Sequence, residues 1–347
     1  MFNMSKLTLQ TALIAVAALL ATACTLPDDN GKTGKAKRFV NETVLSYTPV
    51  KDQGPSSMCW AYAMLATIET EHIMMGDSVN LSVDFVARRL LAEQARCHFL
   101  SRGYDRVTMR GTAPLLLRLI GEYGAMPYDS YNHPGLNYKA LAKRIVLLSQ
   151  ASHDMSELAD RAERMFDEHI GALPPKVHML GAEYTPEEFA HSVCMRGEYI
   201  AITSFTHHPF GETFVLEIPD NYSDELFYNV PIDVMMRRIE RSLRMGHPVC
   251  WEGDTSEAGF SFKRGVAEII KSQPCTQRLR QKAFETRQTT DDHCMELIGI
   301  AHDDRGKRYY IAKNSWGTDN PYGGLMYLSD DYVRMKTIAV VVKNINL

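Results

Sequence analysis

The sequence predicts an α+β fold in which a helical lobe precedes a strand-rich lobe. Apolar residues recur at helical spacing as far as Gly246. After Pro248 the pattern changes to short apolar runs bounded by Gly, Asp or Asn, which is typical of strands. The third observation is Cys59, which directly precedes an apolar helix-forming run, with a histidine and an asparagine far downstream. Two such lobes would bring these residues together in a cleft.

The first 23 residues are expected to be a signal peptide outside the fold. Leu7–Leu20 is a mostly apolar run of 14 residues, too short for a comfortable membrane span. A small-residue segment follows it and ends at Cys24, as in bacterial lipoproteins that are cleaved before a cysteine and lipidated on its thiol. The alternative is an ordinary secretory peptide cut after Ala23. We therefore expect a location in the bacterial cell envelope, either lipid-anchored, with the outer membrane favoured, or secreted to the periplasm.

Residues 24–42 are expected to be a tether. The stretch Leu26–Arg38 is polar, contains glycine and shows no hydrophobic period. The folded domain is then expected over residues 43–347, which is a length suited to two lobes that share a cleft.

The first helices can be assigned from their start signals. Cys59–Met75 is apolar on most faces and is expected to be a buried central helix. Ser82 is expected to cap a second helix that runs to about Gln94. Thr112 and Pro114 mark the start of a third helix.

Further helices are expected in the middle of the chain. Residues 136–170 have a helix-rich pattern with one polar face. Thr185 and Glu188 form a capping box with Pro186 at the first helical position. Ile232–Leu243 has an amphipathic period that stops before Gly246. The expected strands then follow in the last third of the chain: Pro248–Trp251, Met295–Ile300, Tyr309–Lys313, Leu325–Leu328 and Thr337–Lys343.

Four residues form a candidate catalytic set. Cys59 at a helix start is exposed to the positive end of the helix dipole, which favours the nucleophilic thiolate. His293 can act as acid and base, and Asn314 can accept a hydrogen bond from its second ring nitrogen. The Gln53 amide and the Cys59 backbone N–H can bind an oxyanion. Trp316 is expected to shield the histidine–asparagine bond from water.

Composition excludes several classes of partner. The formal net charge of −4 and the pI near 6.3 argue against nucleic acid. We expect no metal and no cofactor, because no Cys or His spacing fits a metal site. Few or no disulfides are expected, although one pair stays open. Five cysteines remain after the lipidation and nucleophile positions: Cys97, Cys194, Cys250, Cys275 and Cys294. Cys294 is expected to be a core residue.

These segments resemble the papain-like cysteine peptidases, specifically the bleomycin hydrolase and aminopeptidase C branch. The resemblance covers about residues 44–343. Besides the catalytic segments, it rests on four stretches: Gly121–Pro127, Tyr184–Phe189, Asn229–Val234 and Gly323–Asp330.

The resemblance implies a papain-like fold with a helical lobe, a β-sheet or barrel lobe and a cleft between them. It also implies hydrolysis of peptide bonds, with Gln53, Cys59, His293 and Asn314 at the matching motif positions. The helical lobe would take about residues 43–130, a helical insertion about 131–230, and the mainly β lobe about 231–347.

The sequence departs from the family pattern in three ways. Ser56-Ser57-Met58 precedes the nucleophile, where papain-type enzymes more often have Cys-Gly-Ser or Cys-Gly-Ala. The distance from Cys59 to His293 is 234 residues (293 − 59), against about 130–150 in papain. Only Asn344–Leu347 follow the last expected strand, whereas the branch usually has a longer carboxyl-terminal arm in its cleft. We therefore expect cleavage to depend less on a free amino terminus.

The expected function is that of a cysteine peptidase, acting as an aminopeptidase or an endopeptidase on peptides or unfolded proteins. Two alternatives stay open. One is a non-catalytic peptide-binding protein on the same scaffold, and the other is an acyl transferase that uses the same thioester.

Overall fold

A computed structural model describes residues 36–179, 181–270 and 274–345. Of these, Arg38 onward forms one unit, and its central element is helix α2 (Cys59–Met75). Residues Trp60–His72 of α2 are almost all buried, because helices pack on one side and the sheet on the other. The helix ends at Gly76, which has a φ of 96° and donates its N–H to the His72 and Ile73 carbonyls. This left-handed C-cap favours glycine. The expected helix is confirmed.

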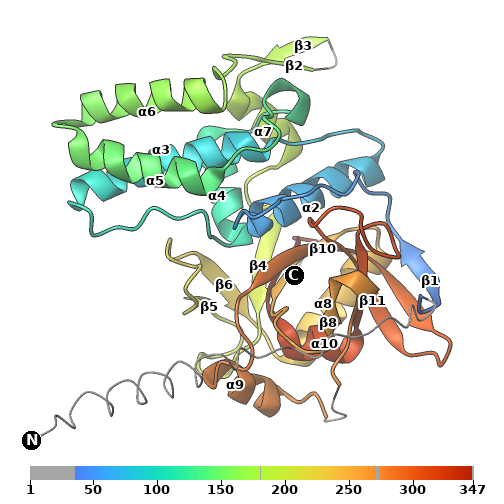
Figure 1. The fold of residues 1–347 in the computed structure, drawn as a ribbon. Helices are drawn as coiled ribbons and strands as arrows, with labels where there is room; N and C mark the ends of the chain where they lie inside the picture. The colour runs from blue at the N-terminus through green and yellow to red at the C-terminus, as the bar shows by residue number, and fades with distance from the viewer. Residues whose placement is uncertain (1–35, 180, 271–273, 346–347) are drawn as a thin grey trace, which may run out of the picture. The chain divides into compact units, whose positions relative to one another are not determined.

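The helical part contains five further α-helices, of which α3, α5 and α6 lie together away from the sheet (Figure 1). Their bounds are α3 Val83–Leu100, α4 Ala113–Tyr123, α5 Tyr138–Ala151, α6 Met155–His169 and α7 Pro186–Val193. Ser82 caps α3 as expected, and the capping box at Thr185 and Glu188 is present. Helix α3 extends six residues beyond Gln94. Thr112 precedes α4, but its side chain makes no cap hydrogen bond.

One eleven-stranded sheet forms the other part, in the order β5-β6-β4-β13-β7-β10-β11-β12-β9-β8, and β1 pairs with β10. Its strands are β1 Phe39–Val44, β4 Tyr199–Thr203, β5 Thr213–Val215, β6 Leu226–Asn229, β7 Val249–Gly253, β8 Phe260–Ser261, β9 Val266–Ala267, β10 His293–Asp303, β11 Arg308–Lys313, β12 Leu325–Ser329 and β13 Thr337–Lys343. A separate hairpin pairs β2 (Val177–Met179) with β3 (Ala182–Tyr184). The five expected strands are confirmed with slightly different ends.

The sheet is buried on both faces. Cys250 and Cys294 belong to the apolar core around α2, whereas Trp251 and Met295 belong to the core around α8 (Ile232–Arg244). Neighbouring residues of a strand point to opposite faces, so β7 and the buried part of β10 are mainly apolar on both faces, although Glu252, His293 and Glu296 are buried there too. Two further helices, α9 (Gln277–Glu285) and α10 (Asp330–Lys336), and two short 3₁₀ turns, Tyr128–Ser130 and Phe262–Arg264, complete the structure.

The boundaries of the expected segments shift in the structure. Strand β1 begins at Phe39, inside the expected tether of residues 24–42, and pairs with β10. Strands β4 and β6 lie within the expected insertion of residues 131–230, yet β4 pairs with β13 in the main sheet. The other elements within residues 131–230 are α5, α6, β2, β3, α7 and β5, and of these β5 also belongs to the main sheet.

The expected signal peptide and Cys24 lie outside the described residues. Among the helices that the structure does describe, none has both the length and the apolar composition that a membrane span requires.

Candidate active site

Cys59 is the first residue of α2 and is half-buried. The Met58 carbonyl accepts the N–H groups of Ala61 and Tyr62, and no side chain caps the helix start. Cys59 thus lies at the start of α2, where the positive end of the helix dipole favours a thiolate.

His293 and Asn314 lie side by side at the same end of two neighbouring strands. His293 begins β10, and Asn314 follows β11 directly. His293 Nε2 lies 2.7 Å from Asn314 Oδ1, and both side chains are buried. Asn314 Oδ1 also accepts the Ser315 N–H at 2.8 Å, which fixes the oxygen toward the ring. His293 Nε2 therefore carries the proton of this bond, and Nδ1 is left for Cys59.

Trp316 covers the imidazole. The His293 and Trp316 ring centroids are 4.4 Å apart, and Phe260 and Phe262 pack edge-on against the same indole. This confirms the expected contact between Trp316 and the histidine. A hydrogen bond kept from water in this way is stronger than an exposed one.

The pKa of the Cys59 thiol is well below its usual value. The largest cause is a hydrogen bond with the Cys294 thiol. Burial opposes it, and the hydrogen bond and positive charge of His293 lower the pKa further. The pKa of Cys294 is raised well above its usual value, because its thiol donates to Cys59 in a buried position. The pKa of Cys59 is thus shifted toward the thiolate form, whereas that of Cys294 is shifted toward the thiol.

Gln53 is positioned beside this group by its own backbone and side chain. Its N–H donates to the Ser315 carbonyl at 2.8 Å, and its Oε1 accepts the Ser315 hydroxyl at 2.6 Å. Gln53 Nε2 donates one hydrogen to the Ser56 carbonyl at 2.9 Å. Since an amide nitrogen has two hydrogens, one stays available for an oxyanion.

A buried polar chain fixes α2 against the strand that precedes Asn314. Glu69 of α2 accepts the Thr48 hydroxyl at 2.5 Å, and Thr48 in turn accepts the Lys313 ammonium at 2.7 Å. Lys51 also donates to Glu69 at 2.8 Å. Because burying these groups is costly without partners, the chain favours one placement of Cys59 relative to Asn314.

Cys294 is the functional contact that sequence reasoning missed. It is buried, as expected of a core residue, but its thiol also contacts Cys59. Its position directly after His293 in the sequence could have indicated that it lies close to Cys59. All six cysteines in the described part of the chain are free.

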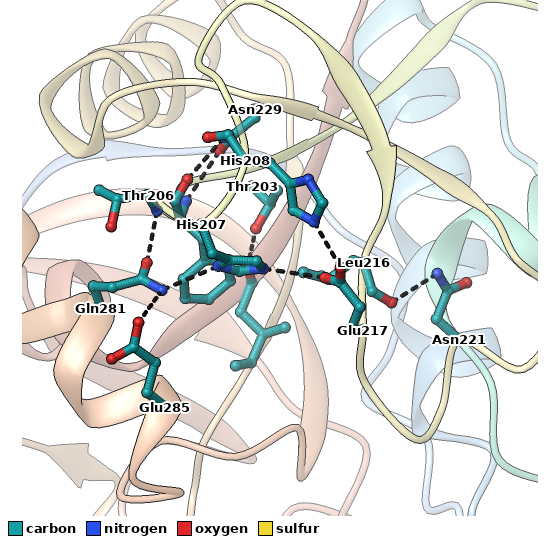
Figure 2. Close-up of polar contacts among 12 residues, drawn as sticks. Thr203, Thr206, His207, His208, Leu216, Glu217, Asn221, Asn229, Gln281 and Glu285 are labelled. Atoms are coloured by element: carbon teal, nitrogen blue, oxygen red, sulfur yellow. Dashed lines mark hydrogen bonds and ion pairs between the residues drawn. The ribbon is translucent and has the colours of Figure 1, made fainter.

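One group among the described residues has the composition of a metal site: His207, His208 and Glu217, whose ligand atoms lie within 4.8 Å of one another. His207 Nε2 and His208 Nε2 lie 3.1 and 2.6 Å from the two Glu217 oxygens. Figure 2 shows both contacts and the Gln281 amide behind His207.

The Gln281 amide decides what this group can do. Its Oε1 accepts the Thr206 N–H at 2.6 Å, and its Nε2 donates to Glu285 at 2.9 Å and to His207 Nδ1 at 3.0 Å (Figure 2). His207 Nδ1 is therefore an acceptor, and Nε2 carries the proton that Glu217 accepts. A protonated nitrogen has no lone pair for a metal, so these residues fit a hydrogen-bonded clasp rather than a metal centre.

The model of the Peptidase C1-like family matches residues 176–347, which include His293 and Asn314 but not Gln53 or Cys59. A search of curated proteins found no match.

Among solved structures, PepW from Lactobacillus rhamnosis HN001 is similar at a TM-score of 0.67 and 16% identity, covering 98% of this chain and 89% of that one. Bromelain from Ananas comosus, solved with the E64 inhibitor, is 16% identical at a TM-score of 0.41, with 86% of this chain and 94% of that one covered. Xylellain, a cysteine protease from Xylella fastidiosa, is 13% identical at a TM-score of 0.43, with 89% of this chain and 88% of that one covered.

The expected α+β fold, with a helical part and a sheet part of the papain-like kind, is thus confirmed. Residues 176–347 match the Peptidase C1-like family, and the chain folds as papain-like peptidases do.

Proposed function

We propose that this protein is a cysteine peptidase in which Cys59 is the nucleophile, His293 the acid and base, and Asn314 the residue that orients the ring. The observation that carries the proposal is the 2.7 Å contact between His293 Nε2 and Asn314 Oδ1 at two strand ends, together with the lowered pKa of Cys59 at a helix start, to which His293 contributes. Gln53 is the proposed side-chain donor of the oxyanion hole.

The chemistry follows from these positions. The Cys59 thiolate attacks the carbonyl carbon of a peptide bond, and the Cys59 N–H and Gln53 Nε2 bind the oxygen as it gains negative charge. The His293 imidazolium donates its proton to the leaving amine, which departs and leaves a thioester on Cys59. His293 then takes a proton from water, the hydroxide adds to the thioester, and the acid product leaves with the thiolate restored.

A cavity beside Gln53 supports a peptide as substrate. It has a volume of about 630 Å³, is open to solvent, and is bordered by Asp52, Gln53, Tyr62 and Tyr128. This volume lies within the range of about 300–1,000 Å³ typical of ligand sites. We propose peptides or unfolded proteins as substrates, and no nucleic acid partner.

The branch and the location are further proposals. The motif stretches around Tyr184–Phe189 and Gly323–Asp330 support a relative of bleomycin hydrolase and aminopeptidase C. The segment that ends at Cys24 supports a lipid anchor in the bacterial envelope, which mass spectrometry of the native amino terminus tests. A mature protein without diacylglycerol on Cys24 would leave only the secreted form.

The test of activity is incubation with a mixed peptide library, with all product termini mapped. New termini that are absent with a Cys59→Ala variant support the peptidase. Acyl products joined to added amines would instead support the transferase, and binding without any cleavage would support the peptide-binding protein. Equal cleavage by the Cys59→Ala variant would refute the proposal.

A further inference from the structure

Two carboxyl groups lie beside Cys59 without a role in the proposed chemistry. Glu252 is on β7, and its backbone pairs with Cys294 of β10. Asp291 lies two residues before His293. The side chain of Glu252 is only 2% exposed, and both carboxylates interact electrostatically with the Cys59 sulfur.

The two carboxyls interact with each other. One oxygen of each, Glu252 Oε1 and Asp291 Oδ2, is buried and has no hydrogen-bond donor among the described residues. Burial raises the pKa of Asp291 to about 8 and raises that of Glu252 well above its usual value, and each is raised further by nearby acids. The pair therefore holds a proton near neutral pH, as two carboxyls in contact do.

A third carboxylate, Asp220, lies close to the pair and increases its negative potential. The nearby cation, Arg110, forms an ion pair with Asp220 through Nε. Its Nη2 meets the Asp291 backbone carbonyl at 3.3 Å, not the carboxyl group. The loop that carries Arg110 is fixed next to the nucleophile, because Trp60 Nε1 donates to the Met109 carbonyl at 2.9 Å. Arg110 is thus engaged elsewhere, and the proton that the pair holds is the donor left to these two oxygens.

This arrangement costs stability and does not help the nucleophile. An unpartnered buried polar group destabilises the fold, and more so when it is charged. Negative charge near Cys59 also opposes the thiolate that the peptidase needs. Both costs are offset when a cation enters, because it supplies donors to the free oxygens and cancels the negative potential.

We propose that Glu252 and Asp291 bind a positively charged group of the peptide substrate while Cys59 faces the bond to be cut. The shared chemistry is an ammonium or guanidinium group, which a free amino terminus, a lysine or an arginine can supply. This inference rests on the proposed peptidase function, because the bound group would belong to the peptide substrate. Its test, however, measures binding alone.

The test uses the full chain with Cys59→Ala, which cannot form a thioester, and labelled peptides whose dissociation constants are measured at pH 8. One pair of peptides differs by acetylation of the amino terminus. In a second pair both peptides have an acetylated amino terminus, and they differ only by arginine or neutral citrulline at one position. This position is moved along the peptide from one pair to the next. We expect one cationic peptide to bind at least about tenfold more tightly than its neutral partner, the equivalent of about 1.4 kcal/mol.

The variants separate recognition from general effects. Adding Asp291→Asn, or Glu252→Gln, should reduce that ratio to below about threefold, with the neutral peptide bound as before. Asp292→Asn is the matched control, because this exposed neighbour removes the same charge from the same segment and should preserve the ratio. Thermal unfolding checks that each variant is folded. If Glu252→Gln does not fold, the Asp291→Asn variant alone provides the test, because Asp291 is more exposed than Glu252.

Two outcomes would overturn the inference. One is an equal affinity for every cationic and neutral pair, and the other is a preference that survives both carboxyl substitutions. Neither bears on the peptidase proposal, which stands or falls on cleavage by the protein with Cys59 intact.

Discussion

Two neighbouring regions at the ends of β7, β10 and β11 differ in how far their polar atoms are satisfied. Around His293 and Asn314, the ring nitrogen, the amide oxygen and the covering indole of Trp316 all have partners. Around Glu252 and Asp291, an oxygen of each carboxyl is buried without a donor. The acceptor for the His293 ring is in place without a ligand, and Asn314 Nδ2 is the buried amide atom there that has no partner among the described residues. The carboxyl pair instead lacks a donor, which a ligand could supply.

The largest expected effect is the loss of the proposed catalytic groups Cys59 and His293. Cys59→Ala removes the nucleophile and should reduce turnover on the order of 10⁶-fold. His293→Ala removes the acid and base and should cost about 10³-fold or more. Single-turnover and steady-state assays on one cleaved peptide measure both. His302→Ala is the control, because this histidine of β10 is half-exposed and should leave turnover near that of the wild type. A requirement for His302 rather than His293 would contradict the assignment.

The orienting residue should matter less than the residues it orients. Asn314→Ala removes the acceptor at His293 Nε2 but no proton-transfer group, so we expect a loss of roughly 10- to 100-fold in kcat. Asn314→Asp keeps an acceptor oxygen at that position and should recover part of the activity. If Asn314→Asp is no better than Asn314→Ala, the hydrogen bond is not what Asn314 contributes.

The region around Cys59, His293 and Asn314 could largely be predicted from the sequence. Cys59, His293 and Asn314 each stand where one local pattern ends and another begins, and such junctions are visible in a single chain. The opening of α2 and the ends of β10 and β11 lie close to where periodicity placed them. Gln53 was foreseen as a donor, although its anchoring by Ser315 depends on a contact across 262 residues of chain.

The carboxyl pair could not be predicted in the same way. Glu252 and Asp291 come together only through the register of β7 against β10, which no local pattern specifies. The same holds for Cys294, since alternation along a strand indicates an inward side chain but not that it meets Cys59. Strands β4 and β6 were missed because they are short segments within a helix-rich region, and their pairing with each other and with β13 is long-range.

Thiol chemistry should sharpen the contrast between Cys59 and the buried cysteines around it. At pH 6, iodoacetamide should alkylate Cys59 at least about tenfold faster than the other five described cysteines, because among these six only the pKa of Cys59 is lowered. Burial raises the pKa of Cys194 to about 12 and that of Cys275 to about 11. Peptide mapping by mass spectrometry gives the order of labelling, and equal labelling of several cysteines would contradict it.

The same assay tests the contact with Cys294. Cys294→Ala removes the thiol that donates to Cys59, so the labelling of Cys59 at pH 6 should slow by a few-fold. Cys294→Ser keeps a donor and should label at close to the wild-type rate. If the alanine and serine variants label alike, the His293 imidazolium alone stabilises the thiolate.

The smallest expected effect is a change with pH in how strongly the Glu252–Asp291 pair prefers a cationic peptide. The pKa of Asp291 is raised to about 8, so its carboxyl loses its proton as the pH rises through that value. The groups that face it are Glu252, Asp220, Arg110 and Cys59. In the Cys59→Ala protein the sulfur no longer titrates, and Arg110 stays charged because Asp220 raises its pKa.

The sign of the trend follows from this titration. The ionised pair attracts a cation more strongly, so the preference for an arginine peptide over its citrulline partner should grow several-fold between pH 6 and pH 9. Arginine is the suitable probe because its guanidinium stays charged over this range, whereas a free amino terminus loses its proton near pH 8. The Asp291→Asn variant should show little or no rise. A preference that is constant with pH in the protein with Asp291 intact would mean that this carboxyl does not titrate against the cation, and that Asp220 alone supplies the charge.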